Sequence, residues 1–150
     1  MTGVQTCALP IYRLDNVIFH PTEPRILAVL DWELSTLGDP LADFAYHCMR
    51  WHLTAPQGLA GADLAALGIP SEAQYLRRYL DRVGTAREPS PDEWTYHLVF
   101  NMFRLVGILQ GVAARALQGN ASSAQAIETG KRARPLAEQA WALAQRIGKG

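Results

Sequence analysis

The sequence predicts a mainly α-helical fold in which one short β-hairpin leads into a helical bundle. Two short apolar runs, at 17–19 and 26–30, flank a turn that contains two prolines. Several later segments repeat apolar residues at helical spacing. With 150 residues, 49% of them hydrophobic and 19% charged, the chain has the length and composition of one globular domain. This composition excludes an intrinsically disordered chain.

The expected hairpin joins two short strands. Residues 17–19 read Val-Ile-Phe and residues 26–30 read Ile-Leu-Ala-Val-Leu, so both runs consist of strand-forming or aliphatic side chains. The residues His-Pro-Thr-Glu-Pro at 20–24 place two prolines between them, which blocks regular structure and favours a turn. Two such runs around a turn predict an antiparallel hairpin, and we expect no other sheet.

The first two helices have clear start signals. Asp39 and Pro40 suit the N-cap and the first position of a helix, which we expect to continue to about residue 49. Residues 54–68 are rich in Gly and Ala, and we expect a loop there. Ser71 then caps a second helix, which ends at Gly84.

The longest helix is expected from residue 90 to about 117. Residues 90–93 read Ser-Pro-Asp-Glu, a capping box with proline at the first helical position. Apolar side chains cover most of the circumference of this helix, which predicts a central place in the core. We expect four aromatic residues to be core residues: Trp51, Trp94, Phe100 and Phe103. A last helical tract, from residue 122 or 123 to 147, contains Pro135, where we expect a kink or break.

Charge and cysteine content limit the classes of partner. Fourteen basic residues balance fourteen acidic ones, so we expect no nucleic acid and no acidic membrane as partner. No apolar run approaches the roughly 20 residues that span a bilayer. Two cysteines are too few for a disulfide scaffold, so we expect a cytoplasmic protein.

Residues 1–11 differ in character from the rest of the chain. They read MTGVQTCALPI and resemble the translation of a common short-read sequencing adapter over ten consecutive residues. They lack the basic start and long apolar core of a signal peptide. We therefore expect residues 1–11 to be an artefact outside the fold, and residues 12–150 to form the domain.

The residues with the clearest chemical potential flank the hairpin. Asn16 comes directly before the first strand, and Asp31 comes directly after the second. Residues at these two positions lie side by side at the open end of a hairpin. An amide oxygen and a carboxylate suit Mg²⁺, which takes few protein ligands and leaves room for substrate phosphates. Alternatively, Asp31 is a carboxylate that only caps a loop.

Residues 12–48 read YRLDNVIFHPTEPRILAVLDWELSTLGDPLADFAYHC. This stretch resembles the C-terminal lobe of the aminoglycoside phosphotransferase-like kinases, which share the α+β protein-kinase-like fold. It is most similar to the subgroup associated with acyl-CoA dehydrogenases, whose loop reads H-G-D-Y-R-L-D-N and whose later motifs are L-D-W-E and G-D-P-x-x-D. The tail FNMFRLVGILQGVAARALQGNASSA at 100–124 also resembles that subgroup. The resemblance extends from Tyr12 to the C-terminus.

The resemblance implies a role for each matching residue. Asn16 and Asp31 would hold Mg²⁺, and Glu33 would reach the metal through water. Arg13 would contact the transferred phosphoryl group, although a pair with a surface acid explains this arginine equally well. Asp39 and Asp43 would support the catalytic loop by hydrogen bonds, and a simple N-cap also accounts for Asp39.

The sequence departs from the family pattern at the catalytic base. Counting back five residues from Asn16 places the base at Ile11, which cannot accept a proton. The only lysines are Lys131 and Lys149, so the early lysine that pairs with ATP is missing as well. We therefore expect this chain to be a C-terminal lobe that needs an N-terminal lobe. Alone, it should bind neither ATP nor Mg²⁺ tightly and should be inactive.

Two hypotheses of function remain. In the first, the intact parent transfers the γ-phosphate of ATP to a hydroxyl of a small molecule. By resemblance, that acceptor is a hydroxyacyl-CoA or hydroxy acid rather than an aminoglycoside, and an acyl-CoA dehydrogenase is a partner. In the second, the chain is a non-catalytic helical interaction module. The kinase hypothesis places a pocket between the hairpin and the helix that begins at Ser90.

Overall fold

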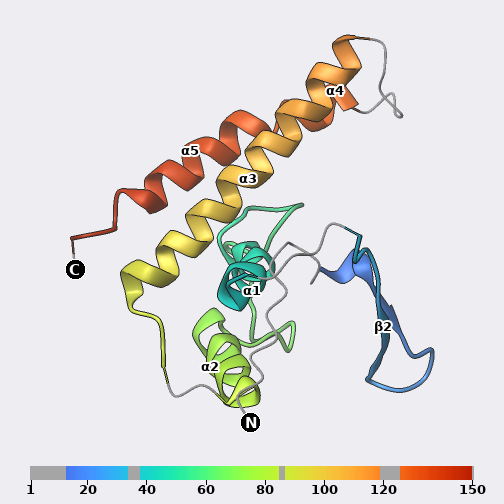
Figure 1. Cartoon of the computed structure of the whole chain (residues 1–150), viewed down its shortest axis with the longest axis vertical. Helices are drawn as coiled ribbons and strands as arrows, with labels where there is room; N and C mark the ends of the chain where they lie inside the picture. Colours follow the sequence, from blue (N-terminus) through green and yellow to red (C-terminus); the bar gives the residue numbers. More distant parts are fainter. Residues whose placement is uncertain (1–12, 34–37, 85–86, 119–125, 150) are drawn as a thin grey trace.

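A computed structural model describes residues 13–33, 38–84, 87–118 and 126–149, and it confirms the mainly helical fold (Figure 1). A 3-10 turn, η1 (Leu14–Asn16), precedes the strands β1 (Val17–Phe19) and β2 (Ile26–Val29). The helix α1 (Pro40–Cys48) continues into a 3-10 turn, η2 (Met49–Trp51). Four helices follow in the described residues: α2 (Glu72–Val83), α3 (Pro91–Leu117), α4 (Ala126–Gly130) and α5 (Ala133–Ala144).

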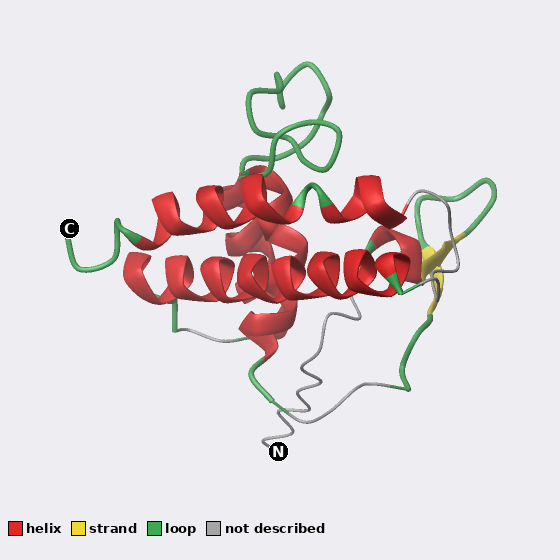
Figure 2. Ribbon diagram, turned by 90° about the horizontal axis from the view of Figure 1, so that it is seen from above, coloured by secondary structure: helices red, strands yellow, loops and turns green. Residues whose placement is uncertain are grey.

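The two strands form the predicted antiparallel hairpin, which projects from the side of the helical bundle (Figures 1 and 2). Val17 pairs with Val29 and Ile18 with Ala28, and the register shifts at Phe19, which pairs with Ile26. Such an irregularity bends a strand and increases its twist. Below the first pair, the backbone N–H of Leu30 donates to the carbonyl of Asn16 at 2.7 Å. The open end of the hairpin is therefore fixed by a hydrogen bond at Asn16.

The helices α1 and α2 begin and end as the sequence predicts. The Asp39 carboxylate accepts from the backbone N–H of Leu41 at 2.9 Å and caps α1. Ser71 and Gln74 form a complete capping box at the start of α2. Gly84 follows α2 in the left-handed conformation, with a φ of 72° that a residue with a Cβ adopts only at a cost.

The start of α3 and the end of the chain differ in detail from the prediction. The Ser90 hydroxyl accepts from the backbone N–H of Glu93 at 3.1 Å, but the Glu93 carboxylate pairs with Arg87 at 2.8 Å, so only half of the capping box forms. The last helical tract breaks after Gly130, and α5 begins at Ala133. Pro135 therefore lies in the first turn of α5, where its missing N–H is not needed.

The core forms where α1, α2 and α3 meet and along the contact of α3 with α5, which run side by side (Figures 1 and 2). The Phe44 ring of α1 stacks on Tyr79 at 3.9 Å and on Tyr75 at 5.2 Å, both from α2, and it reaches Trp94 of α3 at 6.2 Å. Trp51 stacks on Tyr75 at 5.3 Å. The predictions for Trp51 and Trp94 as packed aromatic residues are confirmed.

The expectation that α3 is buried on most of its circumference is wrong for its outer face. Leu98, Met102 and Val106 are buried, but Phe103 is 70% exposed and Phe100 is 40% exposed. The reason is geometric, because α1, α4 and α5 cover only part of the circumference of α3. By length and composition α3 is also apolar enough to cross a membrane, contrary to expectation, although a helix packed within a bundle meets the same criterion.

Candidate functional site

The structure brings Asn16 and Asp31 together at the open end of the hairpin. Nδ2 of Asn16 lies 3.2 Å from Oδ2 of Asp31. Asn16 is buried and its backbone N–H donates to the carbonyl of Arg13 at 2.9 Å, whereas Asp31 is exposed to solvent. The pair therefore has one rigid, buried member and one member that a solute can reach. Their predicted convergence is confirmed.

The backbone at Asp31 is unusual for a residue with a side chain. Its φ of 68° lies in the left-handed region, which Asp and Asn tolerate better than other L-residues do. The following Trp32 holds this turn, because its indole N–H donates to the carbonyl of Val29 at 2.6 Å. A residue kept in a sparsely populated conformation is typical of functional sites, where the surrounding structure fixes a side chain in place.

The pair has the chemistry and spacing of two Mg²⁺ ligands. Adjacent ligands of an octahedral Mg²⁺, at bonds of roughly 2.1 Å, lie about 3 Å apart. A half-turn of the Asn16 amide exchanges Nδ2 and Oδ1, so an oxygen can replace the nitrogen that faces Asp31. Among the described residues there is no group of three or more His, Cys, Asp and Glu side chains placed to hold a metal.

Arg13 forms the surface pair that one of its two interpretations predicts. Its guanidinium pairs with the carboxylate of Asp15, with Nε at 3.0 Å. The pair lies in the segment directly before Asn16, so the arginine stays beside the candidate metal site. A contact between Arg13 and a phosphoryl group remains a prediction.

The other acidic residues take different places. Asp39 caps α1 and its second oxygen pairs with Nε2 of His97 on α3 at 3.4 Å. Asp39 thus ties α1 to α3, and within the described residues it forms no hydrogen bond or ion pair with residues 13–16. Asp43 lies near Tyr79, whose pKa is raised by burial and by the charges of Asp43 and Asp39. Glu33 is exposed, and its water-mediated role remains a prediction.

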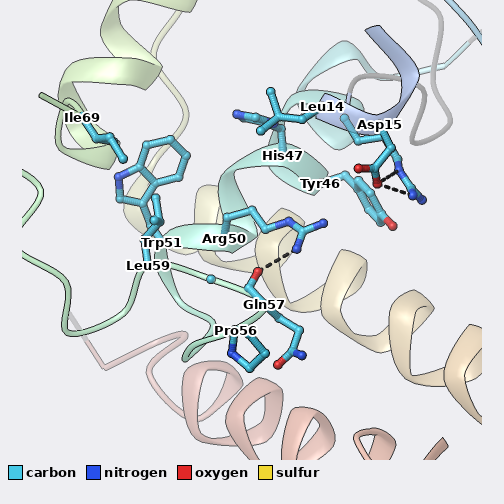
Figure 3. A pocket seen from close by; sticks show the side chains of 12 residues that line it. Leu14, Asp15, Tyr46, His47, Arg50, Trp51, Pro56, Gln57, Leu59 and Ile69 are labelled. Atoms are coloured by element: carbon cyan, nitrogen blue, oxygen red, sulfur yellow. Dashed lines mark hydrogen bonds and ion pairs between the residues drawn. The ribbon is translucent and has the colours of Figure 1, made fainter. Parts of the chain in front are cut away.

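A pocket of about 420 Å³ opens beside this segment, and we call it the η1 pocket (Figure 3). Its polar side comprises Arg13, Asp15, His47, Arg50 and Gln57. Its apolar and aromatic side includes Tyr46, Trp51, Leu59 and Ile69. Figure 3 shows the Arg50 guanidinium bonded to the carbonyl of Gln57, at 2.6 Å. This hydrogen bond holds the positively charged side chain of Arg50 in one position at the pocket wall.

The η1 pocket does not lie where the sequence analysis expected a pocket, between the hairpin and the helix that begins at Ser90. It lies between η1, the end of α1 and the loop at 56–59, and none of its lining residues belongs to β1, β2 or α3. Sequence reasoning missed His47, Arg50 and Gln57 as pocket residues, because the pocket forms only when the loop at 56–59 folds against the end of α1 and η2, and a loop without periodicity does not indicate what it packs against. In the sequence, only Arg13 and Asp15 could be linked to the site, because they lie next to Asn16.

Burial changes the proton affinity of two groups near this pocket. Burial, and secondly the charge of Arg50, lowers the pKa of His47 below its usual value. His47 is therefore a neutral ring at neutral pH rather than a second cation. Burial also raises the pKa of the Cys48 thiol well above its usual range, with a smaller contribution from Glu72. Cys48 is thus an inert core thiol.

A cluster of polar side chains connects the segment around the η1 pocket to α2 and α3. The Glu72 carboxylate, at the start of α2, lies 2.9 Å from Nε2 of His52 and accepts from the indole N–H of Trp94 at 3.1 Å. The indole N–H of Trp51 donates to the carbonyl of Pro70 at 3.1 Å. These bonds hold the segment after η2 between α2 and α3. The predicted base position, Ile11, lies outside the described residues.

Comparison with protein families gives the decisive observation. Residues 12–82 match the model of the phosphotransferase enzyme family, and this range contains Arg13, Asn16, Asp31 and all the residues that line the η1 pocket. This match covers slightly less than half of the chain. The resemblance of the hairpin motifs to this family is therefore confirmed.

Relatives and a solved structure extend the similarity beyond the family match. The chain is 46% identical to acyl-CoA dehydrogenase family member 10 of Mus musculus over 91% of its own length, and it spans 13% of that protein. It is 39% identical to family member 11 of Homo sapiens and spans 17% of it. A solved structure of a protein from Ralstonia eutropha JMP134, described as a putative aminoglycoside phosphotransferase, is 56% identical with a TM-score of 0.83. That match covers 93% of this chain and 42% of the other.

Proposed function

We propose that this chain supplies the metal-binding and acceptor-binding part of a kinase, which transfers the γ-phosphate of ATP to a hydroxyl group of a small molecule. The observation that carries the proposal is the convergence of Asn16 and Asp31 within residues that match the phosphotransferase family model. Two oxygen ligands on one side of a cation leave its other positions for water and phosphate oxygens.

Each part of the site has a distinct task in this proposal. Mg²⁺, when bound, neutralises charge on the phosphate oxygens of ATP. The buried Asn16 fixes the position of the pair, and the exposed Asp31 supplies its negative charge. Arg13 is held by Asp15 at the edge of the η1 pocket, where it orients the phosphoryl group. The proton of the acceptor hydroxyl leaves to a base outside the described residues.

The charge of the η1 pocket supports an anionic or neutral acceptor. Asp15 is the only acidic residue among those that line the pocket, and it already pairs with Arg13. Arg50 therefore leaves the wall cationic, and its charge opposes a polycationic aminoglycoside. We propose a hydroxy acid or hydroxyacyl thioester, with its hydrocarbon part against Trp51, Leu59 and Ile69. The acyl-CoA dehydrogenase names of the relatives agree with a thioester, and such a dehydrogenase is the partner that we propose.

The test is a chimera based on the Ralstonia eutropha protein, in which residues 12–150 of this chain replace the matching segment. We expect transfer from labelled ATP to hydroxyacyl-CoA, and not to aminoglycosides. Asp31→Asn removes the charge that holds the metal and should lower kcat at least about a hundredfold. Asp81→Asn removes the same charge on the exposed side of α2 and should have no effect. Equal activity of the two variants would refute the metal role of Asp31.

The non-catalytic interaction module remains a second candidate because of one observation. The outer face of α3 exposes large apolar side chains, among them Phe103 at 70% and Leu117 at 80%. Exposed apolar patches mark binding surfaces. In the chimera, full activity with Phe103→Ser combined with a loss with Asp31→Asn separates the two hypotheses in favour of the kinase.

A further inference from the structure

A second cavity, of about 370 Å³, is also lined by Arg50, and we call it the α5 cavity. It is open to solvent and is lined by η2 and the residues after it, by α3 and by α5. Its apolar wall is formed by Tyr46, Leu53, Leu105, Leu109, Pro135 and Leu136. The α5 cavity shares Arg13, Tyr46, Arg50 and Gln57 with the η1 pocket, so the two are neighbours.

The α5 cavity contains a buried acceptor without a partner. Oε1 of Gln139, on α5, is shielded from solvent and accepts no hydrogen bond in the described part of the chain. A buried oxygen left in this state costs free energy, and native proteins rarely keep one without a reason. Gln139 as a residue lines the cavity, so a rotation of its terminal amide would bring this oxygen to a ligand that donates an O–H or N–H.

The same cavity carries an excess of positive charge. Three arginines line it, namely Arg13, Arg50 and Arg132, and none of its lining residues is acidic. Arg13 is neutralised by Asp15. Across the described ranges, Arg50 and Arg132 pair with no carboxylate, and the side chain of Arg50 donates to a neutral carbonyl. Two positive charges therefore remain beside an apolar wall.

We propose that the α5 cavity binds a phosphate monoester on an aliphatic body that also carries a hydroxyl or amide donor. A phosphate monoester carries between one and a half and two negative charges near neutral pH, which roughly matches the two arginines. Guanidinium groups bind phosphate oxygens in a fixed, two-pronged geometry. Gln139 accepts from the donor, and the leucines contact the aliphatic part.

The α5 cavity shares Arg50 with the η1 pocket, but its other two binding residues are separate. Arg132 and Gln139 neither line the η1 pocket nor belong to the segment matched to the family. The test of the α5 cavity contains neither ATP nor Mg²⁺. A negative result here would therefore leave the proposed kinase activity untouched, and an inactive kinase would leave this site untouched.

The probe is 4′-phosphopantetheine, which combines a phosphate, an aliphatic centre, a hydroxyl and two amides. Its binding to the 150-residue chain is measured by titration calorimetry. Two control ligands are titrated in the same way: pantetheine, which lacks the phosphate group, and inorganic phosphate, which lacks the aliphatic part. We expect phosphopantetheine to bind at least about tenfold more tightly than either. Equal affinity for pantetheine, or no advantage over inorganic phosphate, would overturn the proposal.

Variants assign the binding to the named side chains. Arg132→Gln should weaken phosphopantetheine binding about tenfold, whereas the matched control Arg134→Gln should not, because Arg134 pairs with Glu138 outside the cavity. Gln139→Leu should weaken phosphopantetheine severalfold and leave the weak binding of inorganic phosphate unchanged. Circular dichroism checks that each variant is folded, and Arg132, being exposed, is a safe substitution. Equal effects of Arg132→Gln and Arg134→Gln would refute the site.

Discussion

At the scale of single residues, Asp31 has two properties that substitutions can separate. Its carboxylate faces Asn16, and its backbone has a φ of 68°. Asn tolerates this backbone and keeps an oxygen toward Asn16, whereas Ala does neither. We predict that Asp31→Asn leaves the free energy of unfolding within about 0.5 kcal/mol of wild type, and that Asp31→Ala lowers it by about 1–2 kcal/mol. Urea unfolding measures both, and equal values would contradict the backbone argument.

His47 gives a second prediction at this scale, concerning pH. Its pKa is lowered in the folded protein, first by burial and then by Arg50. Between the lowered value and the usual value of 6.5, the unfolded chain binds more protons than the folded chain does. Stability should therefore be complete above pH 6.5 and should fall as the pH decreases below it.

The measurement compares wild type with His47→Gln in urea unfolding at pH 7.5 and pH 5.5. The other titrating groups are common to both proteins, so the difference between them isolates His47. We expect wild type to lose more stability than the variant on acidification. A larger loss in the variant would mean that the folded state favours the charged ring.

At the scale of elements, helix ends were predictable from the sequence and helix contacts were not. Asp39, Ser71 and Gly84 act within one or two turns, so their effect is readable from neighbouring residues. The Glu93 side chain fails to complete its capping box because Arg87 competes for it. Asn16 and Asp31 were predictable as a pair because a hairpin joins them. The η1 pocket and Gln139 depend on segments far apart in the chain.

The contact of α4 with α3 leads to a prediction at the element scale. A Cβ added at Gly130 would lie 2.3 Å from the Cβ of Ala113, so the helices would have to separate. Gly107, on α3, has nothing within 4 Å of its added Cβ. We predict that Gly130→Ala lowers the free energy of unfolding by about 1–3 kcal/mol. Gly107→Ala should raise it by about 0.5–1 kcal/mol, because Ala favours a helix.

Urea or thermal unfolding of the two variants provides the check. They add the same methyl group to a helical glycine, so helix propensity alone predicts the same sign for both. Opposite signs support the close approach of α3 and α4. Stabilisation by Gly130→Ala would show that the two helices are not packed as closely as described.

At the scale of the whole molecule, the two cavities share the wall formed by Arg50 and Gln57. The η1 pocket lies beside the candidate metal site, whereas the α5 cavity reaches along α5. In the proposed division of tasks, the bundle positions Arg50 and Arg132, and the hairpin carries the candidate metal ligands Asn16 and Asp31 at its open end. The candidate metal ligands thus come from residues before 48, whereas Arg50 and Arg132, the two arginines of the α5 cavity that pair with no carboxylate among the described residues, come from later segments.

The last prediction concerns the activity of the 150-residue chain alone. Phosphoryl transfer depends on positioned groups that act together, namely a base, a metal site and contacts to ATP. The base position holds Ile11, and the only lysines are Lys131 and Lys149. We predict no transfer from labelled ATP to hydroxyacyl-CoA or aminoglycosides, and no rescue by Ile11→Asp, which restores the base without the ATP contacts. The chimera with the Ralstonia eutropha protein is the positive control. Turnover by the 150-residue chain itself would show that its own residues supply the base and hold the nucleotide, and it would overturn the division of tasks proposed above.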